Sequence, residues 1–309
     1  MGRDGVRRPT DRRGLAGRAL AAVLALGLLG ATGAMPAAAT RERASGPVDV
    51  LYAGSLLDLM TQSIGPAYDR SSGDKLQGYP GGSVALANEI KGKLIQADVF
   101  ISAEPSVNQS LMGSANGNWV AWYATFAKAP LVIGYNPNSR FAPLFKTEPW
   151  YQVLTTPGFL VGRTDPTLDP KGVLTIQVVQ KEALLLHRPG LVSQMLGPAE
   201  NPAQIFPEQE LVGRLLAGQL DGGFFYQNEA IQAKIPYITL PASIDLSALY
   251  TVTVVRSAPH PAAAAALIDF LYSAQGRSLM EQSGLSPLAP TLTGQKAAVP
   301  ASLSHLFSH

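Results

Sequence analysis

Apolar and polar positions after Val48 alternate between short apolar runs and stretches with helical periodicity. The apolar runs predict strands at 48–53, 75–81 and 97–103, and the stretches between them predict helices at 56–73 and 83–93. Such alternation is typical of an α/β fold, and here it indicates one built on largely parallel strands. These residues would form one βαβαβ lobe.

The middle of the chain predicts a crossing into a second lobe. The segment "WVAWYATFAKAPLVIGYNPNS", residues 119–139, is long for a strand, and Pro130 removes a backbone donor, so a break is expected there. The second lobe would hold strand-and-turn segments at 159–166 and 221–230 and helices at 173–187 and 209–219.

The chain is then expected to return to the first lobe. Residues 249–256 predict a strand and 260–284 predict helices that pack on the lobe that starts the chain. The expected division is therefore 40–129 with 247–309 as one lobe and 130–246 as the other. Two crossings would make a hinge.

Residues 1–39 predict an export signal instead of part of the fold. Six Arg residues precede the apolar run "ALAAVLALGLLGATGAM", and Ala37–Ala39 offers small residues for cleavage near Ala39. A membrane anchor is the alternative, but the run is short and lacks a basic stop. "TDRRGLAG" resembles a twin-arginine motif, although Gly14 and Leu15 depart from it, so both the Sec and the twin-arginine routes stay open. The mature protein would be periplasmic or extracellular.

Composition and charge limit the classes of partner that this protein can bind. Hydrophobic residues make up 46% and charged residues 15%, as in a chain with an ordinary packed core. Residues 1–46 hold a charge of +5 in a chain of net charge +2, which leaves −3 for the remainder. Nucleic acid is not an expected partner, because phosphate binding requires clustered Lys and Arg. The sequence has no Cys, so neither disulfides nor a lipid-attachment Cys is expected.

Two similar corners follow predicted strands, in "YAGSLLD" and "YPGGSVAL". Each places Gly and then Ser, at Ser55 and Ser83, where a helix is expected to begin. The start of a helix has unpaired N–H groups and a positive dipole end, and Gly allows close approach, so such a corner suits an oxyanion. The alternative at each position is an ordinary Ser N-cap.

Six segments in order, "VLYAGSL", "GGSVALANEI", "ADVFISAEPS", "WYATFAKAPLVIGYNPNS", "DPTLDPKG" and "DGGFFYQNEA", resemble the periplasmic molybdate/tungstate-binding proteins of ABC importers, especially the tungstate-binding branch. The resemblance implies a type II solute-binding fold whose two α/β lobes close over a tetrahedral oxyanion. It implies a monomeric, non-enzymatic binding subunit without cofactor, which serves a permease and an ATPase and takes molybdate or tungstate as ligand.

The resemblance also implies a set of ligand contacts. Ser55 and Ser83 would bind from the first lobe, and the Lys171 amide in "DPKG" and Tyr226 in "FFYQ" would bind from the second. A further amide is expected near Glu208 or Gln209. For Tyr226 the alternative is core packing.

Two positions limit that comparison. Asp169 matches an Asp that can join the coordination sphere of the metal atom of the oxyanion, but it can equally cap the helix that follows. Phe225 stands where the family has a second acidic ligand. A six-coordinate site is therefore not expected, nor is any other metal site. Arg163 could supply charge to an anion, but an exposed or lobe-bridging ion pair is the commoner use of such an Arg and is expected here.

Two other functions stay open. One is binding of another small anion or organic acid on the same fold, which the Phe225 substitution favours. The other is an exported serine hydrolase, which rests only on the Gly-Ser corners. Against the hydrolase, no G-x-S-x-G motif is present, and the four His residues, at 187, 260, 305 and 309, are scattered.

Overall fold

A computed structural model describes residues 46–308 of the chain. The expected export signal and its cleavage site lie outside the described residues. Within 46–308, none of the helices combines the length and the apolar character needed to cross a bilayer.

The first sheet begins with the parallel strands that the sequence predicted. Its strands are β2 (Lys75–Gly81), β1 (Pro47–Ala53), β3 (Val99–Ser102), β8 (Ser247–Val254) and β4 (Trp122–Tyr135), in that order, with β9 (Ser286–Gly294) also paired to β4. Both neighbours of β1 run parallel to it, whereas β3 pairs with β8 in the antiparallel sense. The strands at the start of the chain are thus confirmed.

Strand β4 passes through Pro130 without a break, so the expected interruption is wrong. Pro130 is in register with Ser247, the first residue of β8, and beyond it the Leu131 amide donates to the Leu246 carbonyl over 2.8 Å. Since Pro130 lies at the end of this ladder, its missing donor removes no bond from the middle of a sheet.

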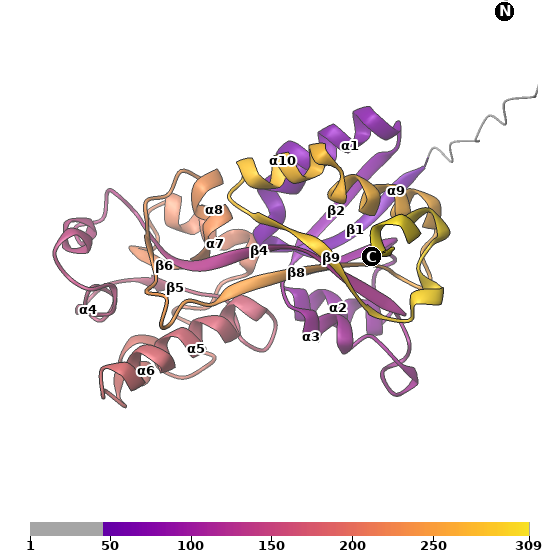
Figure 1. The fold of residues 1–309 in the computed structure, drawn as a ribbon. Helices are drawn as coiled ribbons and strands as arrows, with labels where there is room; N and C mark the ends of the chain where they lie inside the picture. Colours follow the sequence, from indigo (N-terminus) through magenta and orange to yellow (C-terminus); the bar gives the residue numbers. More distant parts are fainter. Residues whose placement is uncertain (1–45, 309) are drawn as a thin grey trace, which may run out of the picture. The chain divides into compact units, whose positions relative to one another are not determined.

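Beyond Pro130, β4 enters a second sheet. There it pairs in the antiparallel sense with β6 (Gly222–Tyr226) and β7 (Tyr237–Thr239), and β5 (Val161–Gly162) lies parallel to β6. Strands β4 and β8 lie side by side as antiparallel neighbours in the first sheet (Figure 1). The expectation of a largely parallel fold is corrected, because these two long connecting strands make the sheets mixed.

Strand β9 was missed by the sequence analysis. Pro287 and Pro290 in "SPLAPTLTG" argue against a strand, yet β9 pairs only with β4, where an edge position tolerates proline.

Helices flank the strands and close the core. Their bounds are α1 (Gly65–Ser72), α2 (Ser83–Lys91), α3 (Pro105–Gln109), α4 (Trp150–Leu154), α5 (Pro170–Leu185), α6 (Leu191–Leu196), α7 (Glu208–Leu216), α8 (Gln227–Gln232), α9 (Pro261–Tyr272) and α10 (Ala274–Gln282). A 3₁₀ turn at Gly54–Leu56 and a π-helical stretch at Leu59–Ile64 precede α1. Helix α9 packs on β1, β8 and α1, which confirms that the chain returns to its starting sheet.

Asp98 ties the first sheet to α9. Its buried carboxylate accepts hydrogen bonds from the Asp49 amide (2.9 Å) and from the His260 amide, and its Oδ2 lies 3.0 Å from His260 Nδ1. Replacing Asp98 by Asn should lower the free energy of unfolding by about 1 to 2 kcal/mol, because one acceptor of a buried network is lost. Urea unfolding of D98N against D269N, which removes a carboxylate from an exposed pair with His305, will measure the difference. Equal midpoints for the two variants would show that Asp98 has no such role.

Candidate functional site

The two Gly-Ser corners lie where β1 and β2 end, but neither Ser caps a helix. Ser55 lies within the 3₁₀ turn and Ser83 is the first residue of α2, and neither turn has a side-chain cap. Both side chains are buried. Ser55 Oγ is 2.9 Å from Tyr250 Oη, and Ser83 Oγ accepts from the Ala103 amide over 3.1 Å, so the Ser83 proton is free to be donated. The ordinary N-cap alternative is therefore wrong at both positions.

Gly54 and Gly82, the glycines of the two corners, lie close to the start of α7 and to the turn before α5, respectively. A Cβ at Gly54 would lie 3.0 Å from Glu208 Oε2, and one at Gly82 would lie 2.6 Å from the Leu168 carbonyl oxygen. That carbonyl accepts from the Val84 and Ala85 amides, each over 3.1 Å. Glycine is required here by close approach between the two halves of the site.

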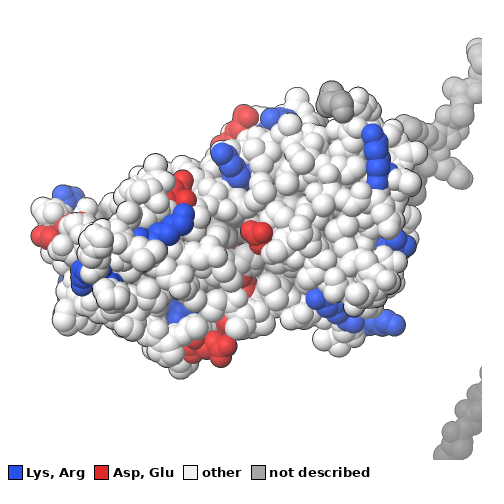
Figure 2. Space-filling model, turned by 60° about the horizontal axis from the view of Figure 1, so that its bottom comes forward, with Lys and Arg blue, Asp and Glu red and all other residues white. Residues whose placement is uncertain are grey.

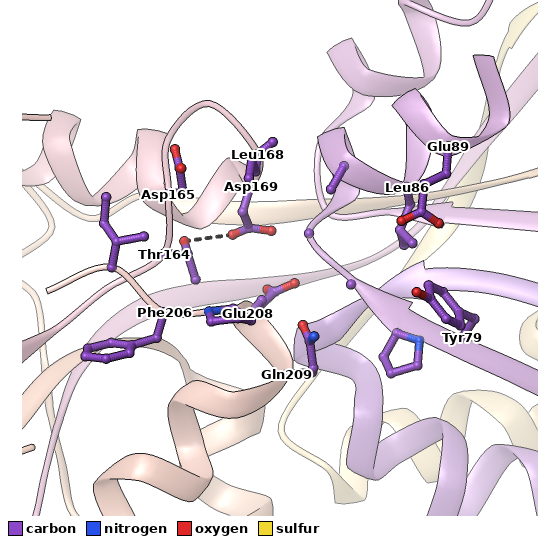
Figure 3. A pocket seen from close by; sticks show the side chains of 16 residues that line it. Tyr79, Leu86, Glu89, Thr164, Asp165, Leu168, Asp169, Phe206, Glu208 and Gln209 are labelled. Atoms are coloured by element: carbon purple, nitrogen blue, oxygen red, sulfur yellow. Dashed lines mark hydrogen bonds between the residues drawn. The ribbon is translucent and has the colours of Figure 1, made fainter. Parts of the chain in front are cut away.

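Asp169 caps α5 in the way that one of its two sequence alternatives proposed. Its Oδ1 accepts from the Lys171 amide over 2.9 Å. It also accepts from Thr164 Oγ1 over 2.9 Å, as Figure 3 shows. The Lys171 amide, expected as a ligand donor, is therefore already engaged. Asp169 Oδ2 is buried and has no hydrogen-bond partner among the described residues.

The Lys171 side chain is buried among carboxyl groups. Its Nζ lies 2.8 Å from the Glu229 carboxylate and 3.4 Å from Glu208 Oε1. Burial alone would lower the pKa of Lys171, but Glu229, Glu208 and Asp169 raise it to about 12. Glu229 also accepts from the Tyr226 amide over 2.7 Å, so it joins the start of α8 to α5.

Glu208 brings a side chain, and not only an amide, into the site. Both of its carboxyl oxygens are buried without a hydrogen-bond partner among the described residues. Burial, followed by repulsion from Asp169, raises the pKa of Glu208 to about 8. Burial likewise raises the pKa of Asp169. Figure 3 shows the Asp169 and Glu208 carboxyl groups directed toward the same space.

Tyr226, at the end of β6, is fully buried and its hydroxyl has no partner among the described residues. Its ring lies edge-on to that of Tyr250 at 6.2 Å, and Lys171 Nζ is 5.1 Å from its centroid. Burial, with Asp169 as the next cause, raises the pKa of Tyr226 well above its usual value, so the phenol is a neutral donor.

Two cavities flank this cluster. One of about 260 Å³ is lined by Gly82, Leu168, Asp169, Phe206 and Glu208, among others, and is shown in Figure 3. A second of about 410 Å³ is lined by Ser55, Asp58, Glu208, Glu229 and Gln232, among others. Glu208 and Gln209 line both cavities. Ser83, Lys171 and Tyr226 line neither of these two cavities.

On the face that Figure 2 shows, Lys and Arg side chains lie singly or in small groups among uncharged residues.

Residues 48–286 match the sequence model of the family described as bacterial extracellular solute-binding protein. The chain belongs to that family. An uncharacterised solute-binding protein of Petrotoga mobilis is 28% identical over 81% of this chain and 86% of its own length. The molybdate/tungstate-binding protein of Pyrococcus abyssi is 25% identical over 68% of this chain and 74% of its own.

Solved structures of solute-binding proteins share the fold. The periplasmic molybdate-binding protein of Azotobacter vinelandii aligns with a TM-score of 0.60 at 18% identity, over 77% of this chain and 98% of that one. The α/β two-lobe fold expected from the sequence is thus confirmed. Members of this family bind solutes, and the hydroxyls of Ser55 and Ser83 are bonded to Tyr250 and to the Ala103 amide rather than to histidine.

For this solute-binding protein, the sequence analysis missed the carboxyl groups of Glu208 and Glu229 and the hydroxyl of Tyr250. A signal was present for Glu229, because Lys171 lies in the first turn of α5, where the helix dipole disfavours a cation unless an acid is near. Phe225 is a core residue that packs with Leu211 and Val132, so no carboxylate enters the site from that position.

Arg163 also differs from expectation. It is fully buried and donates to Gln204 Oε1 over 3.1 Å and to the Pro198 carbonyl over 3.0 Å, so it forms neither an exposed nor a lobe-bridging ion pair. Its role is to hold the loop after α6 against β5.

Proposed function

We propose that this protein is the extracytoplasmic binding subunit of an ABC importer and that it holds molybdate or tungstate between two lobes. The lobes would be residues 40–129 with 247–309 and residues 130–246, with the crossings at β4 and before β8 as the hinge. Family membership and the names of the relatives support an imported oxyanion. A permease and an ATPase would be its partners, and export would place it outside the cytoplasm.

The observation that carries the proposal is the buried Tyr226 hydroxyl, which has no hydrogen-bond partner within residues 46–308 although the Tyr226 ring lies beside that of Tyr250, the partner of Ser55. A buried donor without a partner costs stability, so its retention points to a ligand acceptor. Ser55, Ser83 and Tyr226 are neutral donors, which can bind a dianion without a cluster of basic side chains.

Calorimetric titration of the chain from residue 40 onward with molybdate, tungstate, sulfate and phosphate tests this function. Tight binding of molybdate or tungstate, with sulfate and phosphate much weaker, is expected. If neither of the first two produces heat or a thermal shift, the proposed ligand is wrong.

Replacing Tyr226 by Phe separates binding from folding. Because the hydroxyl has no partner in the described structure, its removal should leave the free energy of unfolding unchanged or slightly higher. The affinity for molybdate or tungstate should fall about tenfold, which corresponds to one lost hydrogen bond to a charged ligand.

Ala in place of Tyr226 is a poor substitute, since it also removes a core ring. Tyr272→Phe is a matched control, because that hydroxyl already donates to the Thr125 carbonyl over 2.7 Å. The control should lose stability and keep its affinity. If Y226F instead lost stability and kept its affinity, Tyr226 would have a purely structural role.

A second candidate is binding of another small anion or an organic acid, which the absence of a carboxylate at Phe225 and the presence of Glu208 favour. The same titration panel, extended to small carboxylic and phosphorylated acids, distinguishes it from the first.

A further inference from the structure

Acidic groups outnumber basic ones in the buried cluster behind the cavities. Asp169 comes from the turn before α5, Lys171 from α5, Glu208 from α7 and Glu229 from α8, and all four side chains are buried. Three carboxyl groups therefore share one ammonium group in a region where water cannot compensate charge.

The ammonium group is committed to one of the three. Lys171 Nζ is 2.8 Å from Glu229 but 3.4 Å from Glu208, and Glu229 receives a further bond from the Tyr226 amide. Among the described residues, neither Glu208 oxygen has a hydrogen-bond partner, and neither has the Oδ2 of Asp169, the carboxyl group whose charge helps to raise the pKa of Glu208. Lys171 is thus the one ammonium group that the structure describes near three buried carboxyl groups, and Glu208 has the longer of its two carboxyl contacts.

The other polar groups of the buried cluster are neutral: Ser55 and Tyr250 are hydrogen-bonded to each other, and Tyr226 lies beside Tyr250. The further charged residues that line the two cavities with Glu208 are all acidic, namely Asp58, Glu89 and Asp165. A second negative charge brought to this space would be repelled by a Glu208 carboxylate. A Glu208 carboxylic acid would instead donate a hydrogen bond to an oxyanion oxygen.

We propose that Glu208 binds the oxyanion as a carboxylic acid that donates a hydrogen bond to an oxyanion oxygen, so that affinity falls at alkaline pH, where the anion can enter only together with a proton. This inference rests on the proposed function. Where Glu208 is ionised in the free protein, one proton passes from solvent to a Glu208 oxygen as the anion enters and returns to solvent when the anion leaves. Where Glu208 is already an acid, no proton moves, and in neither case does another covalent bond change.

The sign of the pH dependence follows from this exchange. Burial holds the pKa of Glu208 at about 8 in the free protein, so below that pH the acid is already present and binding takes up no proton. Above it, a proton must be taken from solvent, and the dissociation constant should rise roughly tenfold per pH unit. Molybdate and tungstate are dianions throughout this range, so the ligand itself does not supply the change.

Calorimetry with molybdate in two buffers of different ionisation enthalpy measures the protons directly. Near zero uptake is expected at about pH 6.5 and close to one proton per anion at about pH 9.5. Glu208→Gln keeps the shape and a donor but cannot ionise, so its affinity should stay constant over this range and its proton uptake should vanish.

Glu210→Gln is the matched control, since Glu210 lies on the same helix but forms an exposed pair with Arg214. It should show the proton uptake and pH dependence of the unsubstituted protein. NMR of labelled Glu side chains in the free protein adds a readout that needs no ligand. The Glu signal that is absent in E208Q should titrate above the usual range of Glu.

The outcomes separate the two proposals. Binding of molybdate or tungstate with constant affinity and no proton uptake overturns the proton-linked inference alone. A free-protein NMR titration in which every Glu ionises in the usual range overturns it as well. Absence of binding for every oxyanion at both pH values overturns the proposed function, and this inference with it.

Discussion

Replacing Lys171 by Met is expected to lower the free energy of unfolding by about 3 to 5 kcal/mol at neutral pH. The ammonium group lies in a fully buried position against Glu229 and Glu208, and its removal leaves carboxyl groups in a dry environment without a counter-charge. Met preserves most of the apolar part of the Lys side chain, so the lost stability is due to the removed charge and not to a cavity. Urea unfolding followed by circular dichroism measures it.

The loss should depend on pH in a definite direction. Without Lys171 the carboxyl groups hold their protons more tightly, so their pKa values rise further in the folded state. A raised carboxyl pKa means that the folded state binds more protons than the unfolded state, and stability then falls as pH rises. The deficit of K171M should therefore shrink at about pH 5 and grow at about pH 8.

Two further variants make the result specific. Lys75→Met removes an ammonium group whose side chain is 76% exposed and pairs with Asp69, and it should change stability by less than about 0.5 kcal/mol. The double variant K171M/E229Q removes both members of the closest pair and should recover part of the loss. If K171M and K75M unfold at the same urea concentration, the buried cluster does not contribute as described.

The sequence could predict the fold because its signals are local. The apolar runs that became β1, β2 and β3 and the helical periodicity of α2, α5 and α7 are each visible within a dozen residues. The failures have physical causes of longer range. Pro130 is tolerated because β8 begins opposite it, and the prolines of β9 are tolerated because that strand lies at an edge. Neither pairing can be inferred from the residues near these prolines in the sequence.

The site was predictable only in part, for a related reason. The Gly-Ser corners and the Asp169 cap are local turns, and the residues around them identified Ser55, Ser83 and Asp169. The partners of those groups come from far along the chain. Asn228 Nδ2 donates to the Ser55 carbonyl over 2.7 Å, and Tyr250 contacts its hydroxyl, across 173 and 195 residues respectively. Charge balance inside the cluster depends on such contacts, which a linear pattern does not contain.

Replacing Gly82 by Ala is expected to weaken oxyanion binding roughly 100-fold, about 2.7 kcal/mol, with little effect on folding. Gly82 has φ −60° and ψ 130°, which Ala adopts without strain. The added methyl would lie 2.6 Å from the Leu168 carbonyl oxygen and 3.2 Å from Asp169 Cβ, so it obstructs the approach of the second half of the site. The closed arrangement becomes rarer, and the apparent affinity falls by the same factor.

Calorimetry gives the affinity of G82A, and small-angle scattering with saturating tungstate compares its closure with that of the unsubstituted protein. Gly190→Ala is the control, because a Cβ there meets nothing within 4 Å and its φ of −81° also suits Ala. Both variants should unfold within about 1 kcal/mol of the parent. If G82A binds as tightly as G190A, the close approach of Leu168 to α2 is not needed for binding. A loss of affinity confined to G82A would mean that Gly82 is needed because it lets the Leu168 carbonyl come close to α2. The hydrogen bonds from the Val84 and Ala85 amides to that carbonyl would then help to hold the site closed.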